Sequence, residues 1–291
     1  MPHLIGMLAP ISWSFIPLLM YYMGGLDSLV TMLISLAFFA FFGLVYLGLF
    51  GKKLSFYYKR PVKYYLNGFL GIFGFHFFYF EALKFAPLIP VFLIINLAGI
   101  LIVLYSGLIN KVRIRPKHIV GLIFNFSAVL VVSLGKEVDP GVYPHSYIGY
   151  LLAFVAPNCW ALYVVYSKKY EDAPSFSVLF SCMITALVIL VVIAMQGNLG
   201  LIMEITPRQL LLCSVLGLLP MGFSFVWWNY GITKGDVRLL SIISYIIPIL
   251  GSIWLMLFGI ERFSASLLLA FILIAIGTGA VLFWKETHQD S

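Results

Sequence analysis

The residues of this chain best suited to chemistry are a few polar side chains embedded in long apolar runs. They are His76, Glu81, Asn96, Asn125, Asn158 and Asn229. Polar groups are expensive inside lipid and normally turn toward the protein interior, so each is a candidate contact for a bound molecule. For each Asn the alternative is a hydrogen bond between helices. His76 is either a cavity residue or a buried, hydrogen-bonded histidine, and Glu81 can pair with Lys84 one turn on.

Aromatic residues accompany these polar groups. Two runs are rich in them, Phe75 to Phe80 and Phe223 to Tyr230. Trp13 and Trp160 each follow a proline by three residues, and a proline inside a helix leaves a backbone carbonyl unpaired. Together these groups supply stacking surfaces with a few hydrogen-bond donors and acceptors, which suits an amphipathic or ring-bearing small molecule.

The composition indicates that lipid covers most of the surface. Of the 291 residues, 62% are hydrophobic and only 10% are charged, whereas a typical soluble domain is about a quarter charged. The net charge of +7 comes from short basic clusters between apolar runs, a pattern that indicates membrane topology rather than nucleic-acid binding. The three cysteines lie inside apolar runs without a CxxC spacing, which supports neither a disulfide framework nor a zinc site.

Hydropathy divides the chain into ten predicted transmembrane helices, each close to the roughly 20 residues needed to cross the hydrocarbon core. They are Leu4–Tyr22, Leu29–Phe50, Tyr65–Phe85, Leu88–Ile109, His118–Leu134, Tyr147–Ser167, Phe176–Met195, Leu210–Ile232, Leu239–Ile260 and Ser264–Trp284. The connections are too short to fold alone, so we expect one membrane domain. The first segment is long enough to span, and we interpret it as a helix of the mature protein rather than a signal peptide.

The distribution of basic residues predicts the orientation of these helices. With both termini on the same side, the loops of that side carry all Lys and Arg residues except Lys84, Lys136, Arg208 and Arg262. Cytoplasmic loops carry the excess of basic residues in membrane proteins. The sequence therefore predicts that both termini are cytoplasmic.

An internal repeat divides the chain into two halves, residues 1–135 and 146–291. The pattern APxxW occurs at Ala9–Trp13 and again 147 residues later at Ala156–Trp160, and residues 82–99 match 231–248 at an offset of 149. Five predicted helices per half is an odd number, so the second half enters the membrane from the opposite side. Inverted repeats build transporters whose halves rock around a midplane site. The alternative is that duplication only built a stable bundle.

Some absences narrow the chemistry further. The first predicted helix contains no acidic residue, which disfavours a proton-coupled drug antiporter that uses a carboxylate there. No Lys or Arg lies near the middle of a predicted span, which argues against a site built around a phosphate. The sequence has no GxSxG elbow, HExxH motif or paired intramembrane aspartates, so an intramembrane enzyme is the least favoured class. We expect no metal and no cofactor.

Several motifs resemble those of a known family. Trp228-Asn229-Tyr230-Gly231-Ile232 and Ser244-Tyr245-Ile246-Ile247-Pro248, with Gly149–Ala153 and Trp160–Tyr163 upstream, are similar to the ten-helix EamA branch of the drug/metabolite transporter superfamily. Within it the likeness is strongest to the bacterial aromatic amino acid exporters. One stretch departs from that pattern: the exporters' fourth helix resembles Asn-Tyr-Leu-Trp-Pro, where this chain has Ile95-Asn96-Leu97-Ala98-Gly99.

The resemblance implies an inverted-repeat fold with a central cavity, and export of amino acids or related metabolites. The residues that match the family's motifs best are Trp228, Asn229, Ser244, Tyr245 and Pro248. The predicted substrate-binding residues are Trp13, His76, Tyr79, Asn96, Asn158, Trp160, Trp228, Asn229, Ser244 and Tyr245, and the predicted helix breaks or hinges are Pro10, Pro157 and Pro248.

The predicted function is thus an alternating-access exporter or facilitator of small amphipathic metabolites in a bacterial inner membrane. Its partners are a small-molecule substrate and the lipid bilayer, without nucleic acid, and it can act as a monomer. The alternatives are an uptake carrier for a nucleoside-like cofactor or other metabolite, an intramembrane enzyme, and a purely structural membrane protein. Direction of transport is not encoded in these residues.

Overall fold

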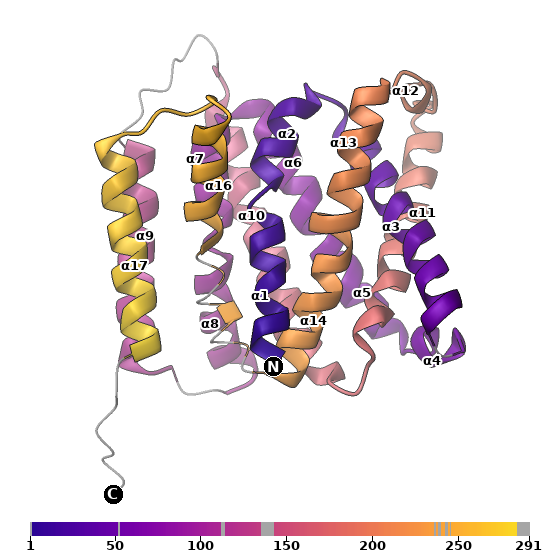
Figure 1. Cartoon of the computed structure of the whole chain (residues 1–291), viewed down its shortest axis with the longest axis horizontal. Coiled ribbons are helices and arrows are strands. Elements are labelled where there is room, and N and C mark those ends of the chain that lie inside the picture. Colours follow the sequence, from indigo (N-terminus) through magenta and orange to yellow (C-terminus); the bar gives the residue numbers. More distant parts are fainter. Residues whose placement is uncertain are drawn as a thin grey trace, which may run out of the picture.

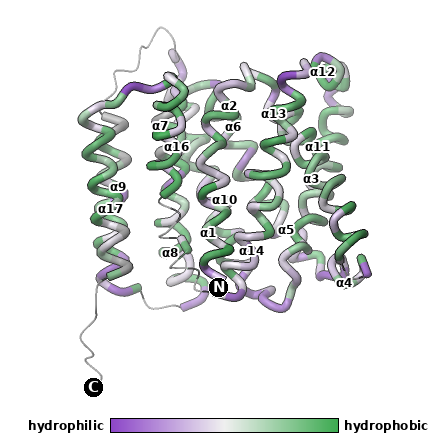
Figure 2. The backbone as a smooth tube through the Cα atoms, in the orientation of Figure 1, coloured by the Kyte–Doolittle hydropathy of each residue, from purple (hydrophilic) through white to green (hydrophobic). Residues whose placement is uncertain are grey.

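A computed structural model describes residues 2–51, 53–111, 114–134, 143–235, 237, 240–241, 244 and 246–283. All regular structure within these residues is helical. The helices lie side by side along one direction (Figure 1). They are apolar along their lengths and hydrophilic mainly at the two edges of the molecule (Figure 2). This is the layout of a multi-pass membrane protein, whose backbone polar groups are satisfied within helices.

Within the described residues, six helical segments are long and apolar enough to cross a membrane. They are Pro2–Met23, Ser28–Phe50, Val62–Phe85, Ser146–Tyr170, Ser175–Met195 and Pro207–Lys234. Shorter apolar helices cover Ala98–Ile109, Ile246–Leu257 and Ala265–Gly277. The all-helical membrane class predicted from hydropathy is therefore confirmed.

Breaks divide two of the predicted spans into half-helices. α1 (Pro2–Trp13) and α2 (Ile16–Met23) are separated by a turn shortly after Pro10. α7 (Leu88–Ile95) and α8 (Ala98–Ile109) are separated at Asn96 and Leu97. In the second half, α16 (Ile246–Leu257) begins two residues before Pro248. By contrast, α10 (Ser146–Ser167) continues through Pro157 without a break.

Two short π-helices lead into the segments that the sequence marks as rich in aromatic residues. η1 (Leu70–Gly74) joins α5 (Val62–Phe69) to α6 (Phe75–Phe85). η4 (Leu219–Phe223) joins α13 (Pro207–Leu218) to α14 (Ser224–Lys234). Pro220 has no N–H to give to an α-helical ladder, which accounts for the irregularity in η4. π-turns of this kind occur frequently at functional sites.

The repeat offset found in the sequence recurs in the boundaries of these elements. η1 and η4 begin 149 residues apart, and α6 and α14 also begin and end 149 residues apart. The same offset separates the starts of α9 (Pro116–Leu134) and α17 (Ala265–Phe283), which pack against each other at one end of the molecule (Figure 1).

Glycines let the halves approach closely at matched places. α13 packs on α3 (Ser28–Phe50), where a Cβ at Gly217 would lie 2.1 Å from the backbone oxygen of Ser35. α5 packs on α11 (Val178–Met195), where a Cβ at Gly68 would lie 2.4 Å from Ser181 Oγ. No larger residue fits at either position without moving the neighbouring helix.

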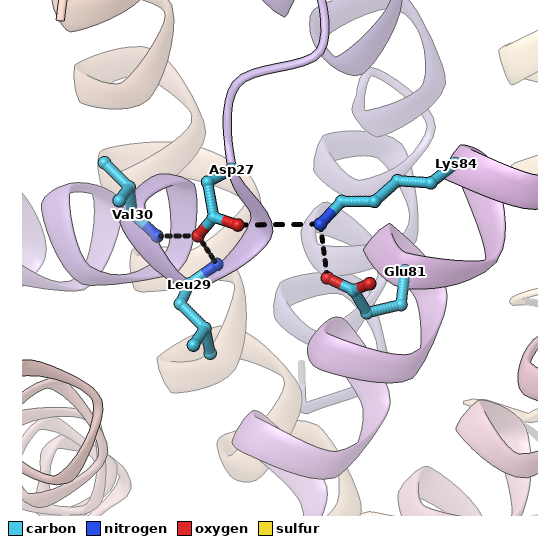
Figure 3. Close-up of polar contacts among 5 residues, drawn as sticks. All are labelled: Asp27, Leu29, Val30, Glu81 and Lys84. Carbon is cyan, nitrogen blue, oxygen red and sulfur yellow. Dashed lines mark hydrogen bonds and ion pairs between the residues drawn. The ribbon is translucent and has the colours of Figure 1, made fainter. Parts of the chain in front are cut away.

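Polar contacts tie the loops to the helix ends at both edges. Asp27 caps α3 by accepting hydrogen bonds from Leu29 and Val30. Lys84, at the end of α6, lies 2.6 Å from Glu81 Oε1 and 3.5 Å from Asp27 Oδ2 (Figure 3). The predicted pairing of Glu81 with Lys84 is thus confirmed.

The corresponding contacts of the second half involve the end of α14. Lys234 Nζ donates to the backbone oxygen of Glu171 (2.9 Å), and Lys168 Nζ donates to that of Thr233 (3.2 Å). The remaining described elements are short: α4 (Ser55–Tyr58), η2 (Lys168–Tyr170), η3 (Ser175–Ser177) and α12 (Gly200–Met203).

Candidate functional site

A cavity lies in the interior where α1, α6, α8, α10 and α14 meet. Its lining is Trp13, Ile16, Phe75, His76, Tyr79, Phe92, Ile95, Asn96, Ala98, Gly99, Ile102, Trp160, Phe225, Trp228, Ser244 and Ile247. The cavity volume that the centre of a water-sized sphere can occupy is about 50 Å³. This is several times the ~10–15 Å³ that one water needs. In this conformation the cavity holds a few waters at most, so a metabolite would need the walls to move apart.

Most of the predicted substrate-binding residues meet at this cavity. Those that line it are Trp13, His76, Tyr79, Asn96, Trp160, Trp228 and Ser244. Tyr245 lies outside the described residues. The structure therefore brings together residues from both halves that are far apart in the sequence, and their role as substrate contacts stays a prediction.

Two of the predicted asparagines do not line the cavity. Asn158 accepts a hydrogen bond from Tyr105 Oη (2.5 Å) and donates to the backbone of Phe154. Asn229 donates to Tyr163 Oη (2.7 Å) and to the oxygen of Phe225 (2.8 Å). Both amides join neighbouring helices, which is the alternative that their positions in apolar runs left open.

Three tryptophans form the centre of the cavity wall. The Trp13 ring centroid lies 5.2 Å from that of Trp160 and 5.1 Å from that of Trp228. Trp13 Nε1 donates to both Pro220 O and Ser224 Oγ, each at 2.9 Å. Because Pro220 lies in η4, the irregular turn of the second half positions a partner for the tryptophan of the first.

The two halves contribute to the cavity from matched positions. His76 and Phe225 are 149 residues apart, as are Tyr79 and Trp228. The rings of His76 and Phe225 lie 5.7 Å apart across the interior. The cavity is therefore centred where equivalent faces of α6 and α14 meet.

Three buried polar atoms on the cavity-lining residues have no hydrogen-bond partner within the part of the chain that the structure describes. They are His76 Nε2, Tyr79 Oη and Trp228 Nε1, on side chains whose exposure is 1% or less. His76 Nδ1 lies 2.9 Å from the oxygen of Ile72; a carbonyl only accepts, so Nδ1 carries the hydrogen and Nε2 of the neutral ring is an acceptor. Buried polar groups usually have partners, so these three atoms are free to bond to a water or a polar ligand in the cavity.

The sequence analysis missed most of the apolar lining. Phe75 and Tyr79, and likewise Phe225 and Trp228, are spaced by four and three residues, so each pair shares a helix face. This helical spacing could have identified Phe75 and Phe225 from Tyr79 and Trp228. Ala98 and Gly99 carried no signal of their own, because the break before α8 was not predicted.

Ionisable groups are scarce in this site. No Lys, Arg, Asp or Glu occurs among the described residues of the cavity lining. Nor does the described part of the chain contain a group of three or more His, Cys, Asp or Glu residues that could hold a metal ion. The chemistry open to the site is therefore binding by ring stacking, neutral hydrogen bonds and helix termini.

Known proteins share this sequence and fold. Residues 1–134 and 147–283 match the EamA-like transporter family. The curated protein "Aromatic amino acid exporter YddG" of Ancylobacter novellus is 33% identical over 77% of this chain and 76% of its own length, and "Uncharacterized transporter YyaM" of Bacillus subtilis is 26% identical over 68% and 66%. A solved structure described as "Crystal structure of protein" superimposes with a TM-score of 0.83 at 28% identity, covering 97% of this chain and 96% of the other.

Proposed function

Because this chain belongs to the EamA-like transporter family and is a membrane transporter rather than an enzyme, we propose that it moves amino acids or related small amphipathic metabolites by alternating access. The central cavity carries this proposal, since it joins an aromatic wall to polar atoms that lack partners. The relative named as an aromatic amino acid exporter supports the same substrate class.

Alternating access would use ten spans arranged as two inverted repeats, residues 1–135 and 146–291. The matched boundaries of η1 and η4, α6 and α14, and α9 and α17 support the repeat.

The directions of α1 and α10 support its inversion. α1 begins beside the end of α14, where a Cβ at Gly235 would meet His3, whereas α10 leads to that same end, where Lys168 reaches Thr233. The two matched helices thus run in opposite directions. We propose that both termini lie on the cytoplasmic side of a bacterial inner membrane, in agreement with the basic loops.

The small size of the cavity supports a closed intermediate of the transport cycle. A space of about 50 Å³ does not admit an amino acid. The broken helices α1–α2 and α7–α8 each present a lining residue at or next to the break, so small rotations about the breaks would widen the site toward one edge.

Transport by the purified protein in liposomes tests this function. The expected result is counterflow of labelled aromatic amino acids, reduced at least tenfold in Trp160→Ala and retained in Leu49→Ala. Leu49 is 70% exposed on the outer surface and is the matched control for folding and reconstitution. Counterflow of nucleosides but not amino acids would favour the uptake-carrier alternative, and an absence of flux across a broad panel would contradict transport of these classes.

A further inference from the structure

An apolar groove lies between α3 and α11, apart from the central cavity. Ala37 and Ala40 of α3 and Ala186 of α11 line it, and these short side chains help to leave about 740 Å³ that the centre of a water-sized sphere can occupy. Apart from two tyrosines, every lining side chain is a hydrocarbon or a methionine, so little in the groove holds water. Ala37 and Leu187 are exposed, and the groove therefore opens toward the surrounding lipid.

The length of the groove matches one leaflet of a bilayer. At one end the rings of Tyr58 and Phe180 lie 5.9 Å apart. At the other end is Leu190, which follows Phe180 along α11 at a distance of about 15 Å by the rise of an α-helix. The hydrocarbon core of a bilayer is about 30 Å thick over its two leaflets. One acyl chain of a phospholipid therefore fits the groove in length.

Basic side chains lie at the tyrosine end of the groove. Lys59 directly follows Tyr58, and Lys63 lies two residues before the second lining tyrosine, Tyr65. Tyr65 Oη donates to the backbone oxygen of Tyr58, which joins the two segments. Both lysines are exposed, and neither forms an ion pair with any residue that the structure describes. This end of the groove lies at the edge of the molecule that carries α4 (Figure 1).

Acidic residues do not offset this positive charge. The sequence has no Asp or Glu at residues 28–80. The two acidic residues of the neighbouring loop have basic partners of their own, since Asp172 lies 3.5 Å from Arg60 and Glu171 lies 3.4 Å from Lys168. The two lysines beside the groove are therefore available to an anion from outside the chain.

We propose that the groove binds an acyl chain of an anionic phospholipid, whose phosphate lies against Lys59 and Lys63. Basic pockets between transmembrane helices on the cytoplasmic side bind anionic head groups. The basic loops place this end of the groove on the cytoplasmic side, where the membrane surface is negative. Membrane topology alone also accounts for basic loops, but it predicts no preference among lipids. The site does not depend on which metabolite is transported.

Two lipids with the same acyl chains test the site in the wild-type protein. Phosphatidylglycerol is anionic, whereas phosphatidylcholine has no net charge. We expect one phosphatidylglycerol to bind per chain about 25-fold more tightly, because each lysine near an anionic head group contributes about fivefold. Native mass spectrometry of the full chain in detergent, titrated with each lipid, measures this ratio. Equal binding of the two lipids would overturn the proposal.

The double variant Lys59→Gln/Lys63→Gln tests the head-group contacts. The preference for phosphatidylglycerol is expected to fall about 25-fold, to near onefold. Its matched control is Lys111→Gln/Lys117→Gln, which removes the same charge between α8 and α9, away from α4 (Figure 1). The control should keep the preference. An equal loss in both double variants would mean that overall charge attracts the lipid, and it would overturn the assignment to Lys59 and Lys63.

Ala37→Phe tests the groove, since it fills the space without changing the charge. We expect both lipids to bind at least fivefold more weakly, with the preference for phosphatidylglycerol kept. The control is Ala275→Phe, at an exposed position of α17 outside the groove, which should bind as wild type does. Unchanged binding in Ala37→Phe would overturn the groove as the site. The melting temperature without added lipid reports damage to folding, and Ala37→Leu is the smaller replacement if Ala37→Phe does not fold.

Discussion

The walls that α6 and α14 give to the cavity share a backbone plan and differ in chemistry. Each is an 11-residue helix that follows a five-residue π-helix, and each presents residues at matched positions. α6 presents His76 and Tyr79, whereas α14 presents Phe225 and Trp228. One wall thus offers an acceptor and a hydroxyl, and the other offers a phenyl ring and an indole N–H.

This difference separates what builds the cavity from what gives it specificity. Close helix contacts at Gly68 and Gly217, and the paired tryptophans Trp13 and Trp160, recur in both halves and set the shape. The side chains that differ between the halves include His76, whose ring bears polar atoms, where the matched residue is Phe225. Substitutions at the recurring positions should therefore damage folding together with transport, and those at the differing positions should damage transport alone.

One of the two largest effects on stability is expected at the glycine contacts. Gly217→Ala would place a methyl carbon 2.1 Å from the backbone oxygen of Ser35, so we expect a loss of stability above about 3 kcal/mol. Gly68→Ala meets the Ser181 side chain, whose Oγ can rotate away although its Cβ at 2.6 Å cannot, and should cost less. Chemical unfolding in detergent measures both.

The control for this pair is Gly48→Ala in α3. A Cβ at Gly48 meets nothing within 4 Å, so the variant should gain about 0.5–1 kcal/mol from helix propensity. Equal losses of stability in Gly68→Ala and Gly217→Ala would contradict this prediction. They would mean that a side-chain neighbour and a backbone neighbour resist the added methyl group equally.

The next prediction compares the loss of stability when each of the two matched tryptophans is replaced. Trp13→Ala removes ring contacts and two hydrogen bonds, to Pro220 O and Ser224 Oγ, whereas no hydrogen bond from Trp160 is recorded among the described residues. We expect a loss of about 3–5 kcal/mol for Trp13→Ala and about 1 kcal/mol less for Trp160→Ala, measured by thermal unfolding. Trp13→Phe keeps a ring and isolates the hydrogen bonds; a melting temperature equal to wild type would mean that these bonds add nothing to stability.

A third prediction replaces a residue of α6 with the residue at the matched position of α14. His76→Phe copies the residue found at the matched position and removes the acceptor Nε2, so counterflow should fall about tenfold. Stability should change by no more than about 1 kcal/mol, because the substitution removes one hydrogen bond, to Ile72 O, together with one unpartnered atom. The opposite result, normal flux with a large loss of stability, would make His76 a structural histidine.

Much of the fold followed from periodicity and composition. The predicted span Leu29–Phe50 became α3 at Ser28–Phe50, and His118–Leu134 became α9 at Pro116–Leu134, because uninterrupted apolar runs define such helices. Pro10 was predicted as a helix break or hinge, and α1 ends three residues after it, whereas the break at Asn96 and Leu97 was not predicted. A half-helix break depends on which carbonyls find partners in other helices, and hydropathy carries no such information.

The candidate site was predictable where polarity or repetition marked a residue. His76 stood out as an ionisable group in an apolar run, and Trp13 with Trp160 as a repeated motif. Asn158 and Asn229 are also polar residues in apolar runs, but they bond to neighbouring helices. The sequence does not distinguish a polar residue that contacts a ligand from one that joins two helices.

The smallest effects are expected at the edges, where the two halves use different contacts. Lys84 pairs with two partly exposed carboxylates, Asp27 and Glu81, so Lys84→Gln should lower stability by less than about 1 kcal/mol. The loss of stability in Lys84→Gln should disappear at about 1 M salt, where the screening length is about 3 Å. Lys234 donates to the neutral backbone oxygen of Glu171, so the effect of Lys234→Gln should persist at high salt. Unfolding of both variants at low and high salt separates an ionic tie from a hydrogen bond; identical salt dependence would contradict the distinction.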